Sequence, residues 1–267
     1  MNMIEPQTLV HLQGGLGNLM FQIATFESIK QLTSINIAFT NFDEQAQEYY
    51  NLGRVNFFNY KNTIFSKIKT NLNFKTNLDR IDIVEHDFIE NFDFIFSDYY
   101  IRFIGYGQNH QNFISRNFTK QLFDIKVNIS ENYKQILDNE NCLALHVRRK
   151  DYLNIPSILP CQSIEYFNDA VDYLGEYEKI FIFSDDINWC KENFKFNKMN
   201  FIDNNEIESL KMMTMCNKHI ISNSTFSWWG AYLSKSDEVV LPNRWFGPEV
   251  LKPRPIEHYK LHNWFCI

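Results

Sequence analysis

The sequence contains few of the features that mark fibrous, disordered or membrane-spanning chains. Its 267 residues include only 9 glycines and 7 prolines, and 22% of them are charged, which excludes a collagen-like or disordered chain. No run of about 18 apolar residues occurs, and the N-terminus lacks a basic segment followed by a long apolar one. We therefore expect no signal peptide and no transmembrane segment, and a cytoplasmic location with peripheral membrane association left open.

Positive charge and paired cysteines are also scarce. Lys and Arg number 26 against 32 Asp and Glu, for a formal charge of -6, so we expect no nucleic acid partner and only a local cationic site. The five cysteines are odd in number and never in C-x-x-C spacing, which predicts reduced thiols. What the chain has instead is apolar bulk: 45% hydrophobic residues, with 25 Phe and 13 Tyr, enough for a substantial core.

The pattern predicts an α/β protein of two domains, with a boundary near residue 135. Residues 7–33 have strand-then-helix character, and 61–135 indicate mixed helices and loops. After 135, short apolar runs alternate with amphipathic segments, which is typical of a parallel sheet covered by helices on both faces. The predicted strands are 142–149, 179–186, 218–223 and, as the last, 238–242; the predicted helices are 163–176, 187–194, 206–217 and 224–234.

The glycine-rich stretch "GGLGNLM" lies between the first predicted strand and the first predicted helix. Glycines let the backbone approach a phosphate, and the first turn of a helix offers it free N–H groups. However, Met20 stands where the G-x-G-x-x-G motif needs a third small residue, and the lysine of a P-loop is missing. A tight turn without a ligand and a ligand-binding turn are equally good interpretations of this stretch alone.

Three polar clusters follow predicted strands, at the edge where ligands bind such sheets. The first, "HVRRKD", contains His146, Arg148, Arg149 and Asp151. Unless the strand has already ended, alternation lets only one of the two arginines face a ligand. A guanidinium suits a diphosphate, because it presents paired donors to two phosphate oxygens. Taken alone, an arginine pair is more often a solvated charge cluster, and a single histidine is more often a satisfied core residue.

The second cluster, "FSDD", ends the next strand in Asp185 and Asp186. Their carboxylates suit ribose hydroxyls, the N–H groups of guanine or a divalent metal, while capping of the following helix is an equally good interpretation for at least one of them.

The third cluster, "SNSTFSWWGA", turns a strand into a helix and places Asn223, Ser224 and Thr225 at a helix N-terminus, which favours an anion site. Ordinary N-capping by the hydroxyls is compatible with that role. Trp228 and Trp229, at helical spacing, are expected to be core residues rather than a platform on which a sugar stacks. Gly230 is expected to let the helix pack close to the sheet.

The strings "GGLGNLMFQIA", "HVRRKDYL", "IFSDDINW" and "IISNSTFSWWGAYLS", in that order, resemble the α-1,2-fucosyltransferases of glycosyltransferase family 11. The resemblance implies a GT-B-like fold, with two Rossmann-type domains facing a cleft. Residues 1–135 would be the acceptor side and residues 136–267 the donor domain. It also implies GDP-fucose as donor, a galactose-containing glycan of surface polysaccharide or O-antigen type as acceptor, and inversion. No cofactor or metal is expected, and no Asp-x-Asp triplet occurs.

By the same resemblance, Arg148 stabilises the departing diphosphate and His146 lies beside the donor. Asp151 is the candidate general base, with orientation of Arg148 as its alternative role. The sequence departs from the residues usual in this family at Leu19, Gly107 and Lys150. These departures leave open which acceptor the protein uses. The residues expected to bind substrate are Gly14, Gly15, Asn18, Arg149, Asp185, Asp186, Asn223, Ser224 and Thr225.

The sequence leaves two rival functions open. One is a fucosyltransferase of another linkage, such as an α-1,6 enzyme, which shares the arginine pair. The other is a non-catalytic module that binds a GDP-sugar or a glycan. The "SNSTFSWWGA" string favours the α-1,2 branch, and a binder has no need of a leaving-group arginine.

Overall fold

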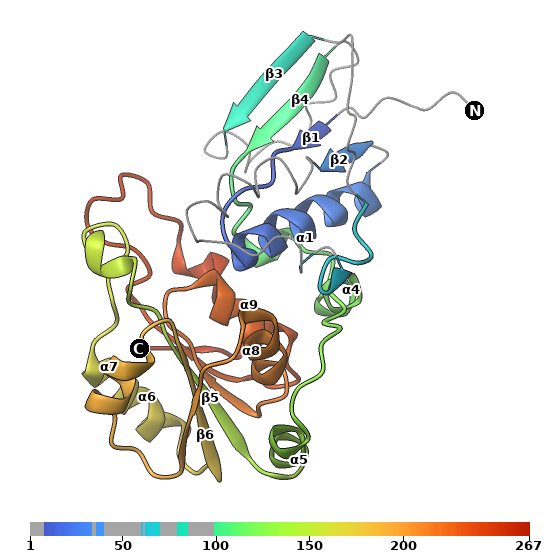
Figure 1. The fold of residues 1–267 in the computed structure, drawn as a ribbon. Helices are drawn as coiled ribbons and strands as arrows, with labels where there is room; N and C mark the ends of the chain where they lie inside the picture. Colours follow the sequence, from blue (N-terminus) through green and yellow to red (C-terminus); the bar gives the residue numbers. More distant parts are fainter. Residues whose placement is uncertain (1–7, 34–35, 40–59, 61, 70–78, 85–98) are drawn as a thin grey trace. The chain divides into compact units, whose positions relative to one another are not determined.

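A computed structural model of the chain (Figure 1) describes residues 8–33, 36–39, 60, 62–69, 79–84 and 99–267. It divides into two compact units, Met1–Lys126 and Val127–Ile267. The boundary expected near residue 135 falls inside helix α5 (Glu131–Asn139) of the second unit. Each unit has its own sheet, and every strand pair in the described residues is parallel.

The first unit has a four-stranded sheet in the order β2-β1-β4-β3. Helix α1 (Leu16–Leu32) follows β1, which confirms the strand and helix expected over 7–33. The expectation of only helices and loops over 61–135 is wrong, because β3 and β4 lie there. Helix α4 (Arg116–Leu122) follows the 3-10 turn η2 (His110–Asn112). The strands are β1 (Thr8–Val10), β2 (Ile37–Phe39), β3 (Asp79–Val84) and β4 (Tyr99–Ile104).

The second unit has a six-stranded sheet in the order β10-β9-β8-β5-β6-β7. The chain runs outward from β5 to β7 and then returns to the other side of β5 with β8. This is the doubly wound order, and its switch point lies between the carboxyl ends of β5 and β8. The strands are β5 (Cys142–Val147), β6 (Lys179–Ser184), β7 (Met199–Ile202), β8 (Lys218–Ile220), β9 (Glu238–Leu241) and β10 (Phe265–Cys266).

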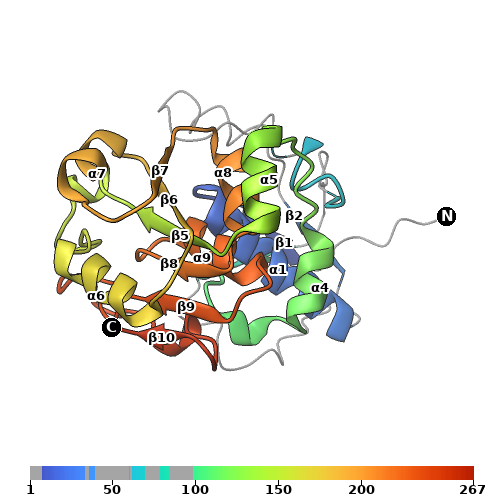
Figure 2. The same cartoon turned by 90° about the horizontal axis from the view of Figure 1, so that it is seen from below.

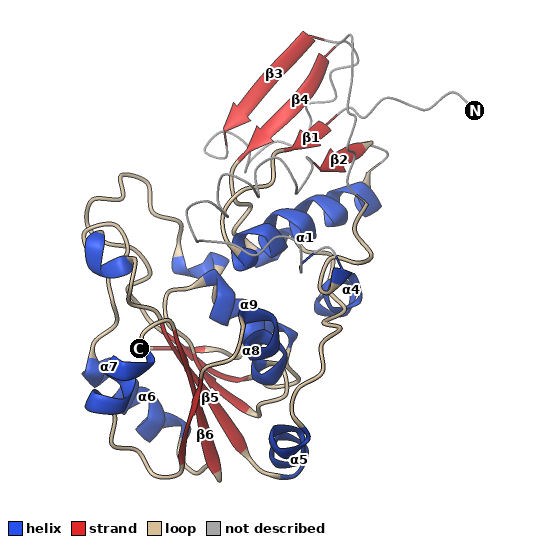
Figure 3. Cartoon of the chain, in the orientation of Figure 1, coloured by secondary structure: helices blue, strands red, loops and turns tan. Residues whose placement is uncertain are grey.

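Helices cover both faces of this sheet, as the sequence predicts (Figures 2 and 3). On one face Leu143 and Leu145 pack with residues of α6 (Ile164–Leu174) and α7 (Ile187–Asn193). On the other face Ala144 packs with residues of α5, of α8 (Glu206–Met213) and of α9 (Thr225–Leu233). The alternation of side chains along β5 therefore decides which helix meets which face.

Two details of the second unit differ from expectation. Strands β7 and β10 were not predicted, so β9 is not the last strand. Gly230 faces helix α8 rather than the sheet, since a Cβ there would lie 2.8 Å from the Met213 Cβ. Trp228 and Trp229 are fully buried, which confirms them as core.

Candidate functional site

His146 and Ser222 join the two strands at the switch point. His146 lies near the end of β5, Ser222 follows β8, and their Nδ1 and Oγ atoms are 2.8 Å apart. The imidazole is 5% exposed, and burial, with a smaller effect of the Arg148 charge, lowers the pKa of His146 to about 3. A neutral, buried and hydrogen-bonded ring is better suited to orienting a neighbour than to exchanging protons. The catalytic role of His146 stays a prediction.

Arg148 lies between two carboxylates. Its Nη2 donates to Asp151 Oδ2 at 2.9 Å, and its Nε lies 3.3 Å from Asp185 Oδ2. Burial alone would lower the pKa of Arg148, but the bond to Asp151 and the charges of Asp185 and Asp151 raise it. The guanidinium stays charged, and the Arg148 side chain is 37% exposed. Since Asp151 is committed to this pair, its orienting role is better supported than a role as base.

Asp185 holds the turn that follows β5. One carboxylate oxygen accepts the backbone N–H of Arg149 at 2.9 Å and the other that of Lys150 at 3.2 Å. The side chain is only 18% exposed. Asp185 therefore fixes the backbone that carries Arg148, in addition to pairing with its side chain.

Arg149 and Asp186 form a second pair. Arg149 Nε lies 3.3 Å from Asp186 Oδ2, and its guanidinium stacks 3.9 Å from the ring centroid of Trp189. Asp186 also accepts the backbone N–H of Trp189, which confirms the interpretation that it caps α7. Strand β5 ends at Val147, two residues before the end predicted from the sequence. Alternation along a strand therefore does not set the directions of the two arginines, whose side chains nevertheless have separate carboxylate partners.

Asn223 is buried, and its side chain is fully hydrogen-bonded. Its Nδ2 donates to the carbonyls of Pro160 at 3.0 Å and Trp245 at 2.9 Å, and its Oδ1 accepts from Gln162 Nε2 at 2.9 Å. At 1% exposure, Asn223 is placed to position loops rather than to contact a substrate. Its assignment to substrate binding stays a prediction without support from this geometry.

Helix α9 begins at Thr225, after Ser224 as N-cap residue. The Ser224 side chain makes no capping bond to this helix, whereas Ser163 caps α6 through its hydroxyl. The N-terminal amides of a helix attract anions. Anion binding by Ser224 and Thr225 at this end of α9 stays a prediction.

The glycine turn lies in the first unit. Gly14 has φ +88°, and a Cβ there would lie 2.7 Å from Asn18 Nδ2. Asn18 Oδ1 accepts from Gln108 Nε2 at 2.7 Å, and Gly15 is the N-cap residue of α1. This turn demands glycine for conformation and space at Gly14, which the interpretation as a tight turn already explains. Its role beside the donor concerns both units and stays a prediction.

Several residues around the switch point were not identified from the sequence. The Tyr152 hydroxyl, in the 3-10 turn η3 (Tyr152–Asn154), donates to the Asn223 carbonyl at 2.9 Å. Gln162 donates both to Asn223 and to the Arg244 carbonyl. Their partners are 61 to 82 residues away, so no local pattern signals them.

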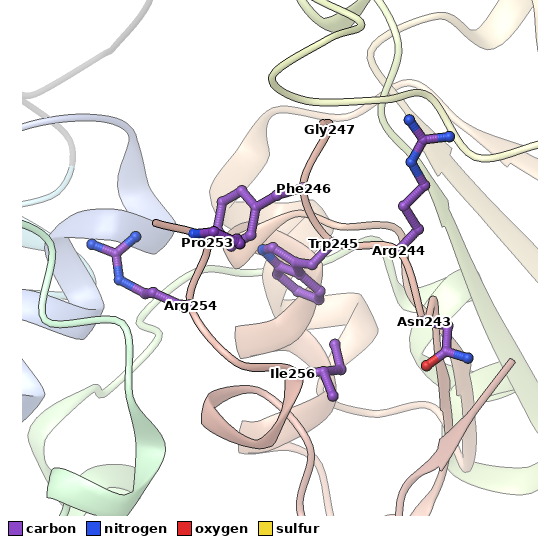
Figure 4. A pocket seen from close by; sticks show the side chains of 8 residues that line it. All are labelled: Asn243, Arg244, Trp245, Phe246, Gly247, Pro253, Arg254 and Ile256. Carbon is purple, nitrogen blue, oxygen red and sulfur yellow. The ribbon is translucent and has the colours of Figure 1, made fainter. Parts of the chain in front are cut away.

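A pocket of about 340 Å³ follows β9 (Figure 4). It extends over the loop to the 3-10 turn η4 (Ile256–His258). The residues that line it are Asn243, Arg244, Trp245, Phe246, Gly247, Pro253, Arg254 and Ile256.

Among the residues that the structure describes, no cluster of three or more His, Cys, Asp or Glu could hold a metal ion. Nor does any helix in the described ranges have the length and apolar character needed to cross a bilayer.

Comparison with known proteins adds a family, relatives and a fold. Residues 7–267 match the sequence profile "Glycosyl transferase family 11". An alpha-1,2-colitosyltransferase of Escherichia coli is 33% identical over 57% of this chain and 58% of its own length. A galactoside alpha-(1,2)-fucosyltransferase 1 of Leontocebus fuscicollis is 31% identical over 38% of this chain and 31% of its own length. The matches therefore span about half or less of these relatives.

A family 9 glycosyl transferase structure from Veillonella parvula covers 100% of this chain and 88% of that one, with a TM-score of 0.50 at 12% identity. Together with the two parallel sheets, this confirms the α/β, GT-B-like fold class predicted from the sequence.

Proposed function

This chain belongs to glycosyl transferase family 11, and from that premise we propose that it is an inverting, metal-independent α-1,2-fucosyltransferase. The donor is GDP-fucose, and the acceptor is the 2-hydroxyl of a terminal galactoside, of surface polysaccharide or O-antigen type. The α-1,2 linkage in the names of both relatives supports the linkage. The central observation is Arg148, a charged guanidinium held between two carboxylates at the switch point of the second sheet.

The proposed reaction is a single displacement. The acceptor oxygen forms a bond to the anomeric carbon of fucose while the bond from that carbon to the β-phosphate oxygen breaks on the opposite face. Negative charge then grows on the departing GDP. Arg148 and the N-terminal amides of α9 are the groups that stabilise this charge, because both favour phosphate oxygens.

The proton of the acceptor hydroxyl must also leave. Asp151 is the candidate base, contributing about two to four orders of magnitude if it acts. Because Asp151 is bonded to Arg148, we assign it first to orienting that guanidinium. Deprotonation late in an oxocarbenium-like transition state then needs no dedicated base.

The test is release of GDP from GDP-fucose, measured with and without a panel of galactosides. We expect release that requires acceptor, persists in EDTA and gives a product with inverted anomeric configuration by NMR. Arg148→Ala should lower kcat by about 10²- to 10³-fold without unfolding the protein. Arg148→Lys keeps the charge but loses the fork of paired donors, and should recover only part of the rate.

Near-normal turnover in Arg148→Ala contradicts the mechanism, and donor binding without turnover on any glycan favours a binding module instead. A colitosyl donor is the second candidate, because one relative bears that name. Comparing nucleotide-activated colitose with GDP-fucose under the same acceptor separates the two.

A further inference from the structure

The pocket after β9 lies at the same carboxyl edge of the sheet as Arg148. A chain of contacts connects them: the Arg148 guanidinium lies 5.8 Å from the Tyr152 ring centroid, and the Tyr152 hydroxyl donates to the Asn223 carbonyl at 2.9 Å. The Asn223 side chain in turn donates to the carbonyl of Trp245, a pocket residue. The pocket is therefore separated from the arginine by two residues in direct contact.

The walls of this pocket are fixed in place. Gln162 Nε2 donates to the Arg244 carbonyl at 3.1 Å, and Gly247 N–H donates to the Ile158 carbonyl at 2.8 Å. At Gly247 a Cβ would lie 2.1 Å from the Ser157 carbonyl oxygen, so only glycine allows the two loops to approach this closely. Binding to a preformed pocket avoids the cost of ordering its walls.

The lining combines aromatic faces with hydrogen-bond donors. Trp245 is 5% exposed and stacks on Tyr259 at 4.1 Å between ring centroids, whereas Phe246 is half-buried, with its ring centroid 6.3 Å from that of Tyr259. In Figure 4 the guanidinium groups of Arg244 and Arg254 lie on opposite sides of these two rings. The eight described residues that line the pocket include no carboxylate.

Such a lining suits a sugar ring. One face of a pyranose carries C–H groups that pack on an aromatic ring, and its hydroxyl oxygens accept bonds from guanidinium and amide groups. The volume lies within the range of about 300–1,000 Å³ that is typical of small-molecule pockets. We infer that the pocket is an acceptor subsite, which binds the sugar unit next to the galactoside that is fucosylated.

This inference rests on the proposed function for its placement. It assigns part of the acceptor site to the unit that the resemblance implies to be the donor domain. Asp185 and Asp186, the residues expected to contact the nucleoside, follow β6, on one side of β5. The pocket follows β9, beyond β8 on the other side of β5. A diphosphate at Arg148 and α9 would lie between them. The nucleoside and the second acceptor sugar would then occupy opposite sides of the reacting centre.

The test compares methyl β-galactoside with a disaccharide acceptor that ends in β-galactose. We expect the unaltered protein to prefer the disaccharide by about tenfold or more in kcat/KM. Phe246→Ala should remove most of that preference by raising the KM of the disaccharide, while kcat/KM for the methyl galactoside and the KM of GDP-fucose stay unchanged. Phe265→Ala, which removes a 40% exposed phenylalanine from β10, is the matched control and should change none of these values.

Gln162→Met tests the positioning of the pocket wall. Methionine keeps the length of the side chain but cannot donate to the carbonyl of Arg244 or the Oδ1 of Asn223. We expect the same selective loss with the disaccharide. A merely structural defect would lower activity on both acceptors equally.

Three kinetic results would overturn the inference: no disaccharide preference in the unaltered protein, an equal loss on both acceptors in Phe246→Ala, or a raised KM for GDP-fucose in that variant. If the unaltered protein releases no GDP with any acceptor, the proposed function fails. Binding of the disaccharide in the presence of GDP, measured by calorimetry, then tests whether the pocket is an acceptor subsite. Binding that Phe246→Ala abolishes supports the subsite, and absent or unaffected binding refutes it.

Discussion

The two carboxylates that pair with Arg148 should differ sharply in their importance for stability. Asp185 is 18% exposed and accepts two backbone N–H groups, while Asp151 is 52% exposed and pairs only with the guanidinium among the contacts described. Replacing each by asparagine keeps its shape. Asp185→Asn turns one of the two acceptor oxygens into a donor, whereas Asp151→Asn still offers an oxygen to Arg148.

The expected losses follow from these contacts. The Arg149 N–H is partly buried and the Lys150 N–H is exposed, so leaving one of them without its acceptor costs about 1 kcal/mol, the low end of the range for a lost acceptor. The partly exposed ion pair adds up to about 1 kcal/mol. We therefore expect Asp185→Asn to lower the free energy of unfolding by about 2 kcal/mol. For Asp151→Asn we expect the free energy of unfolding to fall by less than about 1 kcal/mol, because the ion pair between Asp151 and Arg148 is exposed.

Urea titration followed by tryptophan fluorescence measures this difference directly. All five tryptophans lie in the second unit, so their emission reports on the unit that contains both carboxylates. With an m-value of about 2 kcal/mol/M, the midpoint of Asp185→Asn should fall by about 1 M and that of Asp151→Asn by less than about 0.5 M. Equal midpoints for the two variants would refute the role given to Asp185 in holding the turn.

Two further predictions concern buried positions of the same unit. The pKa of His146 is about 3 in the folded protein and 6.5 when exposed, so the unfolded state binds more protons below pH 6.5. The free energy of unfolding should then fall by about 2 kcal/mol between pH 7.5 and pH 5 through this group. Urea titrations at both pH values should show that fall reduced in His146→Gln, and an unchanged pH dependence would contradict the buried, neutral ring. Gly230→Ala places a methyl group against Met213 and should cost about 1–3 kcal/mol through overpacking; a neutral effect in the same titration would show that α8 and α9 move apart freely.

The sequence predicts the regular part of the second unit because each strand there is a short apolar run followed by an amphipathic helix. Strands β7 and β10 escape this reasoning. In β7 three of four residues are only partly buried, so its apolar signal is weak. In β10 only two residues pair with β9. Strand β3, "DRIDIV", has three charged residues among its six and so lacks the continuous apolar run that marks the strands of the second unit.

For the candidate site, the sequence predicts which residues gather at the carboxyl edge but not what they bind. Polar residues at strand ends indicate a ligand, and the parallel sheet does bring Arg148, Asp185 and Asn223 to one edge. Their hydrogen bonds, however, connect loops that are far apart in the sequence, so no local pattern predicts them. The bonds from the backbone N–H groups of Arg149 and Lys150 to Asp185 are an example. Local helix signals fare better, since capping by Asp186 is predicted and confirmed.

The four hydrogen-bond partners of Asn223 have a consequence for how the protein is made. Tyr152, Pro160 and Gln162 precede Asn223 by 71, 63 and 61 residues, while Trp245 follows it by 22. A growing chain has the first three partners before Asn223 itself is synthesised and the fourth only afterwards. Because domains fold as their residues emerge, the edge that carries the candidate site is completed only after residue 245 has left the ribosome. A nascent chain that ends before residue 245 would hold most of the sheet and leave a buried amide hydrogen without its acceptor.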